Sequence, residues 1–324
     1  GTDAVTALDL NDPIFEIGVT PNRGDCLSIR GIARDLSAKG VGTLKPINIK
    51  KVTIEEFESP VTWSIQNDGN SCSFVVSRYF KDIQNSISPN WLQKKLLSIG
   101  LRPINALVDI TNFITMDLGR PLHVFDADKI GNKLNMRLSN DQENLLALDN
   151  KEYSLNNTTT IIADDKNPLA IAGIIGGSDS GCTLETKNVF LEVAVFNPSM
   201  VAKIGRKLGI NSDARYRFER GLDLEMVNEG LDYATSLIND ICGGSFSKKV
   251  QAGDLDLNKN TISYEFDTFE KTIGIKLSVK DQIKILNNLL FDIEDNRDGT
   301  CNVTIPSWRN DIKKNIDLIE EIIR

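Results

Sequence analysis

The order of the apolar runs constrains the fold of this chain more than any other feature. Between about residues 54 and 248, strand-like runs such as Thr159–Ala163 mix with helix-like runs such as Trp91–Ser98 and Met226–Cys242. The mixture lacks the regular alternation of strand and helix that builds a doubly wound parallel sheet. The sequence therefore predicts the α+β class, with a mixed α/β unit as its largest part.

Two breaks delimit this large unit. A link containing proline and lysine covers residues 45–53, and Gly243-Gly244 with the polar segment 248–260 forms the second break. Glycine pairs and polar runs of this kind usually connect elements of regular structure. We therefore expect a multidomain chain with three parts, at residues 1–48, 49–248 and 249–324.

Shorter patterns describe the two outer parts. The expected elements are a strand at 14–19, a helix at 26–39 that stops at Gly40, helices at 278–290 and 312–323, and a strand at 302–305. The last helical pattern reaches residue 324 without a glycine, asparagine or proline stop. We therefore expect the sequence to be an internal piece of a longer chain.

Composition narrows the classes of function. The 324 residues are 40% hydrophobic, which is enough for two or three hydrophobic cores. The sequence contains no long uncharged apolar window and does not start like a signal peptide. We therefore expect the protein to be located in the cytoplasm. A net charge of −8 excludes a globally basic nucleic-acid binder and permits only a local basic patch. The five scattered cysteines have no CxxC spacing, which indicates reduced thiols instead of a disulfide framework or a zinc site.

The single histidine lies in residues 100–126, where polar residues interrupt apolar ones at fixed points. His123 is flanked by Leu122 and Val124, which suits a packed and hydrogen-bonded core side chain. The same imidazole could instead act as a general base or position a water molecule. The residues alone leave both interpretations open.

Two neighbouring segments allow similar pairs of interpretations. The glycine-rich run 171–178 lacks both phosphate-loop motifs, so its glycines indicate a close approach of backbone to backbone or to a ligand. Glu192 is the single carboxylate in the strand-like run Val189–Phe196. Strand alternation could place it in solvent; facing inward, it would need a partner or a polar group of a ligand.

Charged residues gather in two further segments. The basic cluster consists of Lys203, Arg206, Lys207, Arg215, Arg217 and Arg220. A solvated face is the ordinary explanation, and contact with a phosphate backbone is the alternative. Near the end of the chain, Asp311, Asp317, Glu320 and Glu321 could bind a hard cation such as Mg²⁺, or could favour the start of a helix.

Taken together, these segments resemble the β subunit of bacterial phenylalanyl-tRNA synthetase, in the family's order across nearly the whole chain. Residues 20–28 with 31–34 resemble the end of its B1 domain; residues 102–105 and 119–126, Glu192 and residues 217–221 resemble its B3/B4 domain; residues from about 249 resemble its small helical, winged B5 domain. Five motifs in register make coincidence improbable.

The resemblance implies that residues 49–248 edit mischarged tRNA by hydrolysis. Transferred residue by residue, the editing site contains Arg102, His123, Gly176, Glu192, Ser212 and Ala214. Position 212 is commonly threonine in the family, so this chain keeps the hydroxyl and loses a methyl group.

The chemistry of such a site follows from the difference between two amino acids. A pocket shaped for the phenylalanine ring rejects the added hydroxyl of tyrosine by only about 10², so a second, hydrolytic site that requires the hydroxyl is the remedy. We expect Glu192 and the backbone near Gly176 to recognise the hydroxyl, and Ala214 to leave room for the ring. His123 and Ser212 would position the attacking water. The tRNA 3′ end would be held by Arg102, Arg206, Lys207 and Arg215.

The resemblance also implies partners and cofactors. These are a synthetase α subunit in an α2β2 heterotetramer, tRNA(Phe), tyrosine as the editing ligand, and Mg²⁺ held by Asp311, Asp317, Glu320 and Glu321 near the α-subunit contact. ATP would be used by the parent assembly and is not expected to bind here. The alternative is a non-catalytic module that only docks tRNA or a partner subunit.

Overall fold

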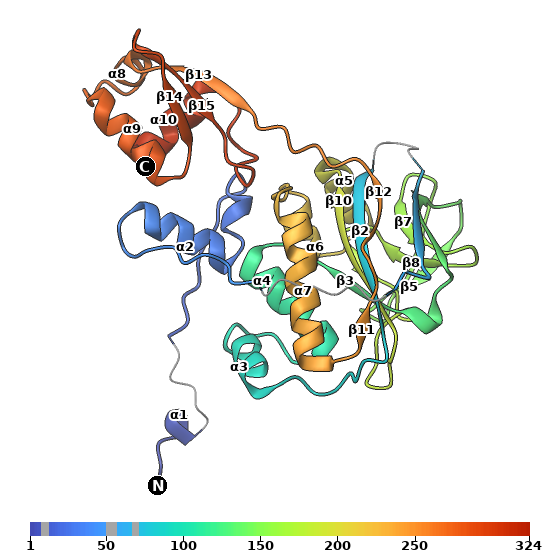
Figure 1. Ribbon diagram of the computed structural model, residues 1–324. Helices are drawn as coiled ribbons and strands as arrows, with labels where there is room; N and C mark the ends of the chain where they lie inside the picture. The colour runs from blue at the N-terminus through green and yellow to red at the C-terminus, as the bar shows by residue number, and fades with distance from the viewer. Residues whose placement is uncertain (8–12, 50–56, 67–70) are drawn as a thin grey trace.

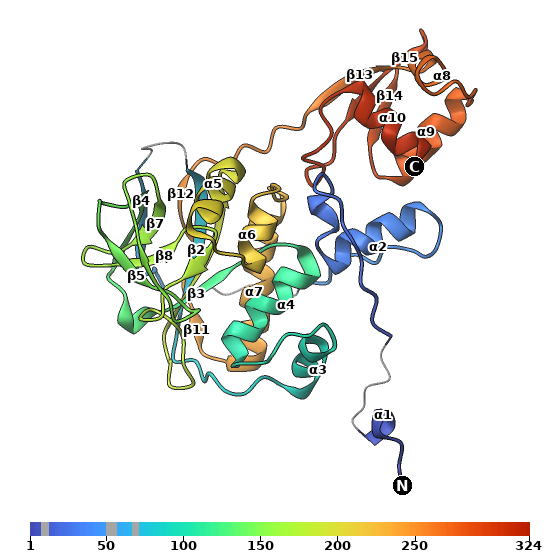
Figure 2. The same cartoon turned by 180° about the vertical axis from the view of Figure 1, so that it is seen from behind.

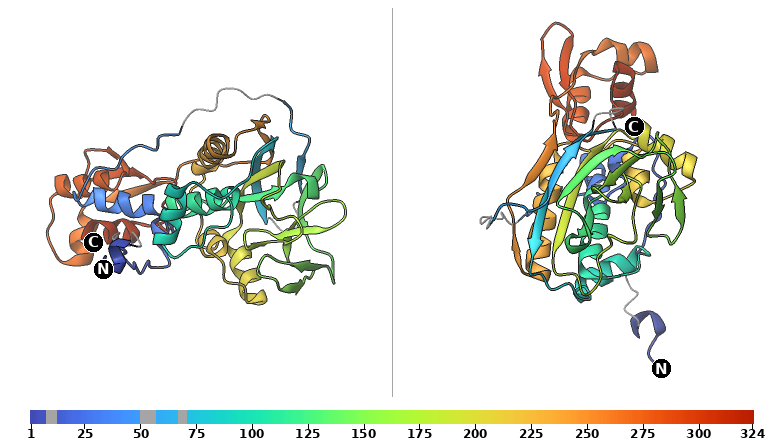
Figure 3. Two further views of the ribbon diagram at one scale, coloured as in Figure 1. Left: turned by 90° about the horizontal axis from the view of Figure 1, so that it is seen from below. Right: turned by 90° about the vertical axis from the view of Figure 1, so that its right-hand side faces the viewer.

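The computed structural model describes residues 1–7, 13–49, 57–66 and 71–324. Three units follow one another along the chain: an N-terminal unit with α1 and α2, a large central unit, and a small C-terminal unit that projects from one end of the central one (Figures 1 and 3). Residues 50–53 of the predicted link lie outside the described residues. The mixture of several sheets with many helices confirms the predicted α+β class.

The helices occupy the following ranges: α1 Ala4–Ala7, α2 Ile29–Ala38, α3 Asn90–Ser98, α4 Ala106–Leu118, α5 Pro198–Leu208, α6 Asp213–Phe218, α7 Met226–Cys242, α8 Asp267–Ile273, α9 Val279–Asn288 and α10 Asn315–Ile323, with short 3-10 turns at Gly24–Cys26 and Ala127–Lys129. None of the helices in the described ranges is long and apolar enough to cross a membrane. None of the five cysteines, all of which lie in those ranges, forms a disulfide.

The described residues of the central unit form two large sheets. The central sheet has the order β11-β2-β10-β3, with β12 also paired to β2, and the outer sheet has the order β1-β4-β7-β8-β9. The strands of the central sheet are β2 Cys72–Lys81, β3 His123–Asp126, β10 Val189–Phe196, β11 Ser245–Phe246 and β12 Val250–Gly253. The strands of the outer sheet are β1 Thr62–Ile65, β4 Lys133–Leu138, β7 Thr160–Ala163, β8 Pro168–Ile171 and β9 Ile175–Gly176. A separate hairpin joins β5 Asn144–Leu146 to β6 Glu152–Ser154.

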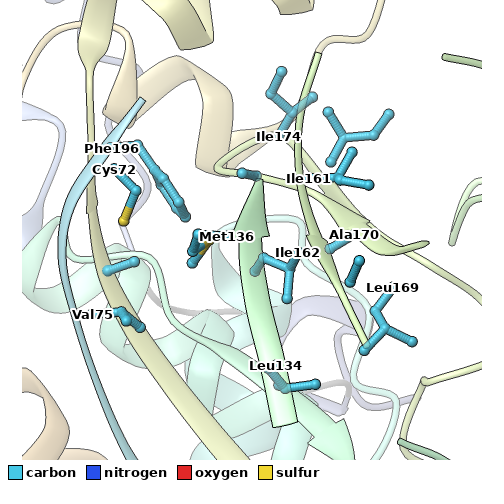
Figure 4. Close-up of a cluster of buried hydrophobic side chains, with 14 of the residues drawn as sticks. Cys72, Val75, Leu134, Met136, Ile161, Ile162, Leu169, Ala170, Ile174 and Phe196 are labelled. Atoms are coloured by element: carbon cyan, nitrogen blue, oxygen red, sulfur yellow. The ribbon is translucent and has the colours of Figure 1, made fainter. Parts of the chain in front are cut away.

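The central sheet is buried on both faces. Helices α3, α4 and α7 pack on one face through one hydrophobic cluster, and the outer sheet covers the other face through a second cluster (Figures 1 and 2). Figure 4 shows this second cluster, with Cys72, Val75 and Phe196 of the central sheet facing Met136 and Ile162 of the outer sheet. The central unit is therefore a three-layer structure, with a cluster of apolar side chains between each pair of layers.

Strand β10 shows how the sequence produces these layers. Side chains alternate along a strand, so odd- and even-numbered residues face opposite sides. Leu191 and Val193 point to the helices, whereas Phe190, Ala194 and Phe196 point to the outer sheet. Both faces are apolar, which explains why the run from Val189 to Phe196 is almost continuously hydrophobic. Position 192 then lies on the face toward the outer sheet.

The C-terminal unit has a core of its own. Strands β13 Thr261–Glu265, β15 Thr300–Thr304 and β14 Asp292–Asp295 form an antiparallel sheet, in that order, on which α8, α9 and α10 pack. The helices predicted at 278–290 and 312–323 and the strand predicted at 302–305 are confirmed within a few residues.

The N-terminal unit differs from its prediction. The helix predicted at 26–39 is confirmed as α2, but residues 14–19 form no strand. Ile14 and Phe15 are strongly exposed, because no strand in the described residues pairs with this segment. Apolar alternation alone does not make a strand without a neighbour to share its hydrogen bonds.

A chain of alternating charges connects the N-terminal and C-terminal units. Asp35 of α2 accepts hydrogen bonds from Arg23 at 2.9 Å and from Arg324 at 2.7 Å. Arg324 also donates to Glu321 of α10 at 2.9 Å, and Glu321 accepts from Arg309 at 2.8 Å. The two units are therefore joined by ion pairs, several of them shielded from solvent.

Candidate functional site

A cavity of about 260 Å³ opens between the central and outer sheets and reaches α4 and α6. This volume is below the roughly 300–1,000 Å³ typical of sites for drug-sized ligands, and it suits a single amino-acid side chain. Most of its walls are apolar, and the polar side chains among its lining residues are Asn112, His123, Glu192, Ser212 and Asp213. An apolar body with a few polar groups is the ligand that such a lining selects.

His123 and Glu192 meet at the centre of this lining. His123 on β3 is directly opposite Glu192 on β10 in the antiparallel register. Residues in such pairs have Cβ atoms about 5 Å apart and share one face of the sheet. Both side chains are on the face that Phe125 and Phe190 share, toward the outer sheet. The two residues therefore converge on one pocket, as the resemblance implied.

Burial changes the charge of both groups. It raises the pKa of Glu192 to about 8, against a smaller opposing effect of the buried Arg120 guanidinium. It lowers the pKa of His123 to about 4. At pH 7 the carboxyl group is therefore mainly protonated and the imidazole is neutral. Within the described part of the chain, Glu192 makes no hydrogen bond or ion pair.

The glycine-rich run places its backbone against His123. A Cβ atom at Gly176 of β9 would lie 2.5 Å from His123 Cε1, so no larger residue fits without moving the ring. One at Gly177 would lie 2.7 Å from the Leu169 carbonyl oxygen. The prediction that these glycines allow close approach of backbone is confirmed. His123 Nε2, near Gly176, has no hydrogen-bond partner among the described residues.

Ser212 and Ala214 form the α6 side of the cavity. The Ser212 hydroxyl donates to the Ile174 carbonyl at 2.6 Å and accepts from the Arg215 amide at 3.1 Å. It therefore caps α6 and fastens the β8–β9 turn to it, which leaves one lone pair for a water molecule. Ala214 packs at the edge of the apolar cluster between the sheets. The small side chain keeps this wall open.

Arg102 lies outside the cavity. It is exposed in the segment between α3 and α4 and is absent from the lining residues. The resemblance includes Arg102 in the editing site, where it would hold the tRNA 3′ end, and the structure places it away from the lining of this cavity. A contact with the tRNA outside the pocket stays a prediction.

The residues predicted to contact RNA divide in two. Arg206 and Lys207 are exposed in the last turn of α5. Arg215 is only 8% exposed, packs over Gly205 of α5, and donates to Asn211 at 3.0 Å and to Glu219 at 3.1 Å. Its guanidinium joins α5 to α6, so a contact of Arg215 with RNA is not supported.

The four carboxylates predicted to bind Mg²⁺ are not arranged around a common point. Arg309 binds Asp311 and Glu321 at 2.8 Å, Asp317 accepts from the backbone amides of Lys313 and Lys314 at the start of α10, and Glu320 is exposed. Across the described ranges, no group of three or more histidine, cysteine, aspartate or glutamate residues could hold a metal ion. The Arg309 guanidinium is paired with two of the four carboxylates, so these residues as arranged do not fit the ion.

Sequence reasoning overlooked three residues near the site. Asn112 of α4 and Asp213 of α6 line the cavity. Arg120, 1% exposed, donates to the carbonyl oxygens of Ala194 and Asp223 and so holds β10 in place. For Arg120 a signal was available, since it lies three residues before His123 in the same motif.

Fold and cavity together define a multidomain α+β protein with a small, mainly apolar cavity between the two large sheets of its largest unit. Comparison with protein families identifies the unit itself: residues 71–243 match the B3/4 domain, and residues 262–324 match the tRNA synthetase B5 domain. The chain therefore belongs to the B3/4 domain family. The predicted limits at residues 48 and 248 stay predictions.

Individual relatives agree with this assignment. The chain is 46% identical to the phenylalanine–tRNA ligase β subunit of Brucella melitensis, covering 100% of this chain and 40% of that protein. It is 44% identical to the corresponding subunit of Rhodopseudomonas palustris, covering 97% and 39%. It thus spans about 40% of the length of these relatives, and the resemblance predicted from its motifs is confirmed.

A solved structure is also similar. It is an N-terminal fragment of the phenylalanyl-tRNA synthetase β subunit from Pyrococcus horikoshii, with 18% identity and a TM-score of 0.45, covering 94% of this chain and 84% of that one.

Proposed function

We propose that this chain is the part of a phenylalanine–tRNA ligase β subunit that hydrolyses tyrosine wrongly attached to tRNA(Phe). The observation that carries the proposal is the opposition of His123 and Glu192 on the wall of one mainly apolar cavity. An apolar cavity with a buried carboxyl group suits an aromatic ring that ends in a hydroxyl group.

Selectivity would come from Glu192. A tyrosyl hydroxyl can satisfy this carboxyl group, which makes no hydrogen bond to the described residues and feels only the charge of Arg120. A phenylalanyl ring would leave the buried carboxyl unpaired, which costs about 1–3 kcal/mol or more. Sites that hydrogen-bond a substrate hydroxyl can reject the analogue without it by about 10⁴.

Hydrolysis needs a water molecule and a proton acceptor. The oxygen of the water would attack the ester carbonyl, the bond between that carbon and the ribose oxygen would break, and the ribose oxygen would leave with a proton. The products are tyrosine and tRNA with a free hydroxyl. Because His123 is neutral at pH 7 and its Nε2 has no partner among the described residues, the imidazole can accept a hydrogen bond from the attacking water and position it, while the proton of the water passes to the leaving ribose oxygen. The Ser212 hydroxyl can accept a hydrogen bond from the same water. Because the ester is labile, positioning of the water alone accelerates its hydrolysis.

The parent assembly is also a proposal, supported by the names of the relatives. We propose an α subunit as the partner in an α2β2 enzyme of the cytoplasm that attaches phenylalanine to tRNA(Phe) with ATP. Exposed Arg206 and Lys207 on α5 and exposed Arg102 would contact the tRNA. No step of the hydrolysis depends on the C-terminal carboxylates.

The proposal is tested by the deacylation of Tyr-tRNA(Phe) and Phe-tRNA(Phe) by the 324-residue chain. Editing predicts rapid release of tyrosine and at least 10² times slower release of phenylalanine. Binding of both tRNAs without turnover would instead support the non-catalytic docking module.

A further inference from the structure

The acidic side chains in the cavity lining have no basic side chain beside them in that lining. The lining, which consists wholly of described residues, contains the carboxyl groups of Glu192 and Asp213 and no lysine or arginine. Glu192 is 5% exposed, whereas the side chain of Asp213 is 58% exposed. One carboxyl group therefore lies deep in the wall and the other lies at the rim.

Asp213 is held at the rim by a buried cation. Its Oδ1 accepts a hydrogen bond from Arg217 Nη1 at 2.9 Å, and Arg217 is only 6% exposed. Arg217 is fixed in turn by the Leu27 carbonyl, to which its Nε donates at 3.1 Å. Asp213 Oδ2 accepts no hydrogen bond within the described part of the chain. The carboxylate is thus oriented, with one oxygen left for a ligand.

We infer that Asp213 binds the α-ammonium group of the aminoacyl ester. This inference rests on the proposed function and adds a second recognition point to it. A tyrosyl ester has polar groups at both ends of its side chain, a hydroxyl on the ring and an ammonium group beside the ester. With the hydroxyl at buried Glu192, the ammonium group lies toward the rim, where Asp213 offers the opposite charge.

The same charges distinguish substrate from product. The ester carries a positive charge near the rim, and hydrolysis adds a carboxylate to the amino acid at that place. No cation among the described lining residues meets the new carboxylate, and Asp213 repels it. The cavity therefore binds esterified tyrosine more tightly than free tyrosine, which helps the product leave.

A binding experiment tests the inference without requiring turnover. Tyramine has the phenol and the ammonium group and lacks a carboxylate, and 4-ethylphenol lacks the ammonium group as well. Calorimetry would compare both ligands on the 324-residue chain and on its Asp213→Asn, Asp213→Glu and Asp165→Asn variants. Asp165 is an exposed carboxylate outside the lining, so it controls for overall charge.

The expected result is a loss of about tenfold in tyramine affinity in Asp213→Asn, with 4-ethylphenol affinity unchanged. Asp213→Glu should keep part of the preference for tyramine, and Asp165→Asn should keep all of it. If Asp213→Asn binds both ligands as the wild type does, or loses both equally, the inference is overturned. An equal loss would identify Asp213 as a support for Arg217 only.

A hydrolysis experiment separates this inference from the proposed function. The substrates are Tyr-tRNA(Phe) and its analogue with 4-hydroxyphenyllactate, in which a neutral hydroxyl replaces the ammonium group. Asp213→Asn should lower kcat/KM about tenfold for the first and leave the second unchanged. Unchanged rates on both contradict the inference alone; a wild-type chain that binds tyramine through Asp213 and hydrolyses neither substrate contradicts the function alone.

Discussion

Glu192 of β10 and His123 of β3 are directly opposite each other in an antiparallel pair, and both line the cavity between the two sheets. The pairing depends on register, because a shift of one residue would turn either side chain into the helical layer. The neutral state of both groups at pH 7 depends on the same burial. Fold and chemistry are thus linked at this pair.

Replacing Glu192 by glutamine should stabilise the chain at high pH. The pKa of the folded-state carboxyl is raised to about 8 from 4.5, so the stability that the protonated form provides is complete below pH 4.5 and declines as the pH rises toward 8. The free energy of unfolding of Glu192→Gln should therefore exceed that of the wild type by about 1–3 kcal/mol at pH 8 and equal it near pH 4.5. Urea unfolding at both pH values measures this. The exposed Glu152→Gln is the control, and an equal gain at both pH values would refute the explanation.

Gly176→Ala should displace His123. The added methyl group would lie 2.5 Å from His123 Cε1, so the imidazole must move away from its place in the cavity. We expect at least tenfold slower hydrolysis of Tyr-tRNA(Phe) and a loss of about 1–3 kcal/mol in unfolding free energy. Gly42→Ala is the matched control, because nothing lies within 4 Å of a Cβ atom there. Full activity of Gly176→Ala would show that the position of the ring does not matter.

Ser212→Ala should cost stability, since the hydroxyl caps α6 and holds the Ile174 carbonyl. A loss of about 1–2 kcal/mol is expected in urea unfolding, and Ser212→Thr should restore it. Rates of Tyr-tRNA(Phe) hydrolysis measured on the same proteins separate two roles. A Ser212→Ala protein with wild-type stability and slow hydrolysis would show a direct role in positioning water and none in holding the fold.

The contact between the outer units should weaken in acid. Burial alone would raise the pKa of Asp35, but hydrogen bonds from Arg324 and Arg23 hold it well below its ordinary value. This stability is present above the ordinary pKa and is lost as the pH falls through the lower, folded-state value. Asp35→Asn should therefore cost about 1–2 kcal/mol at pH 7 and less at pH 3, measured by urea unfolding. The exposed Asp179→Asn should show no such difference; a constant cost for Asp35→Asn would exclude the ion pairs as its cause.

Much of the fold was predictable because its signals are local. Helix α7 and strand β10 have the predicted bounds, since the period of apolar residues is strong in both. Residues 14–19 have a similar apolar pattern and no strand, because a strand also requires a partner that local sequence does not reveal.

The site was predictable only where a motif carried it. His123 has the flanks of a packed core residue, and it is half-buried. The family motif, and then its register with Glu192, made it a candidate site residue. Charge patterns were less informative. Arg215 and Glu321 look like ligand-binding groups in the sequence, but each is held by an internal partner of opposite charge. Such pairing depends on contacts between distant elements.

The central claim is tested most directly by the ratio of kcat/KM for Tyr-tRNA(Phe) to that for Phe-tRNA(Phe), in the wild type and in Glu192→Ala and His123→Ala. The account predicts a wild-type ratio of at least 10², a ratio below about 10 in Glu192→Ala, and slow hydrolysis of both substrates in His123→Ala. Wild-type rates of Tyr-tRNA(Phe) hydrolysis in both variants would contradict it.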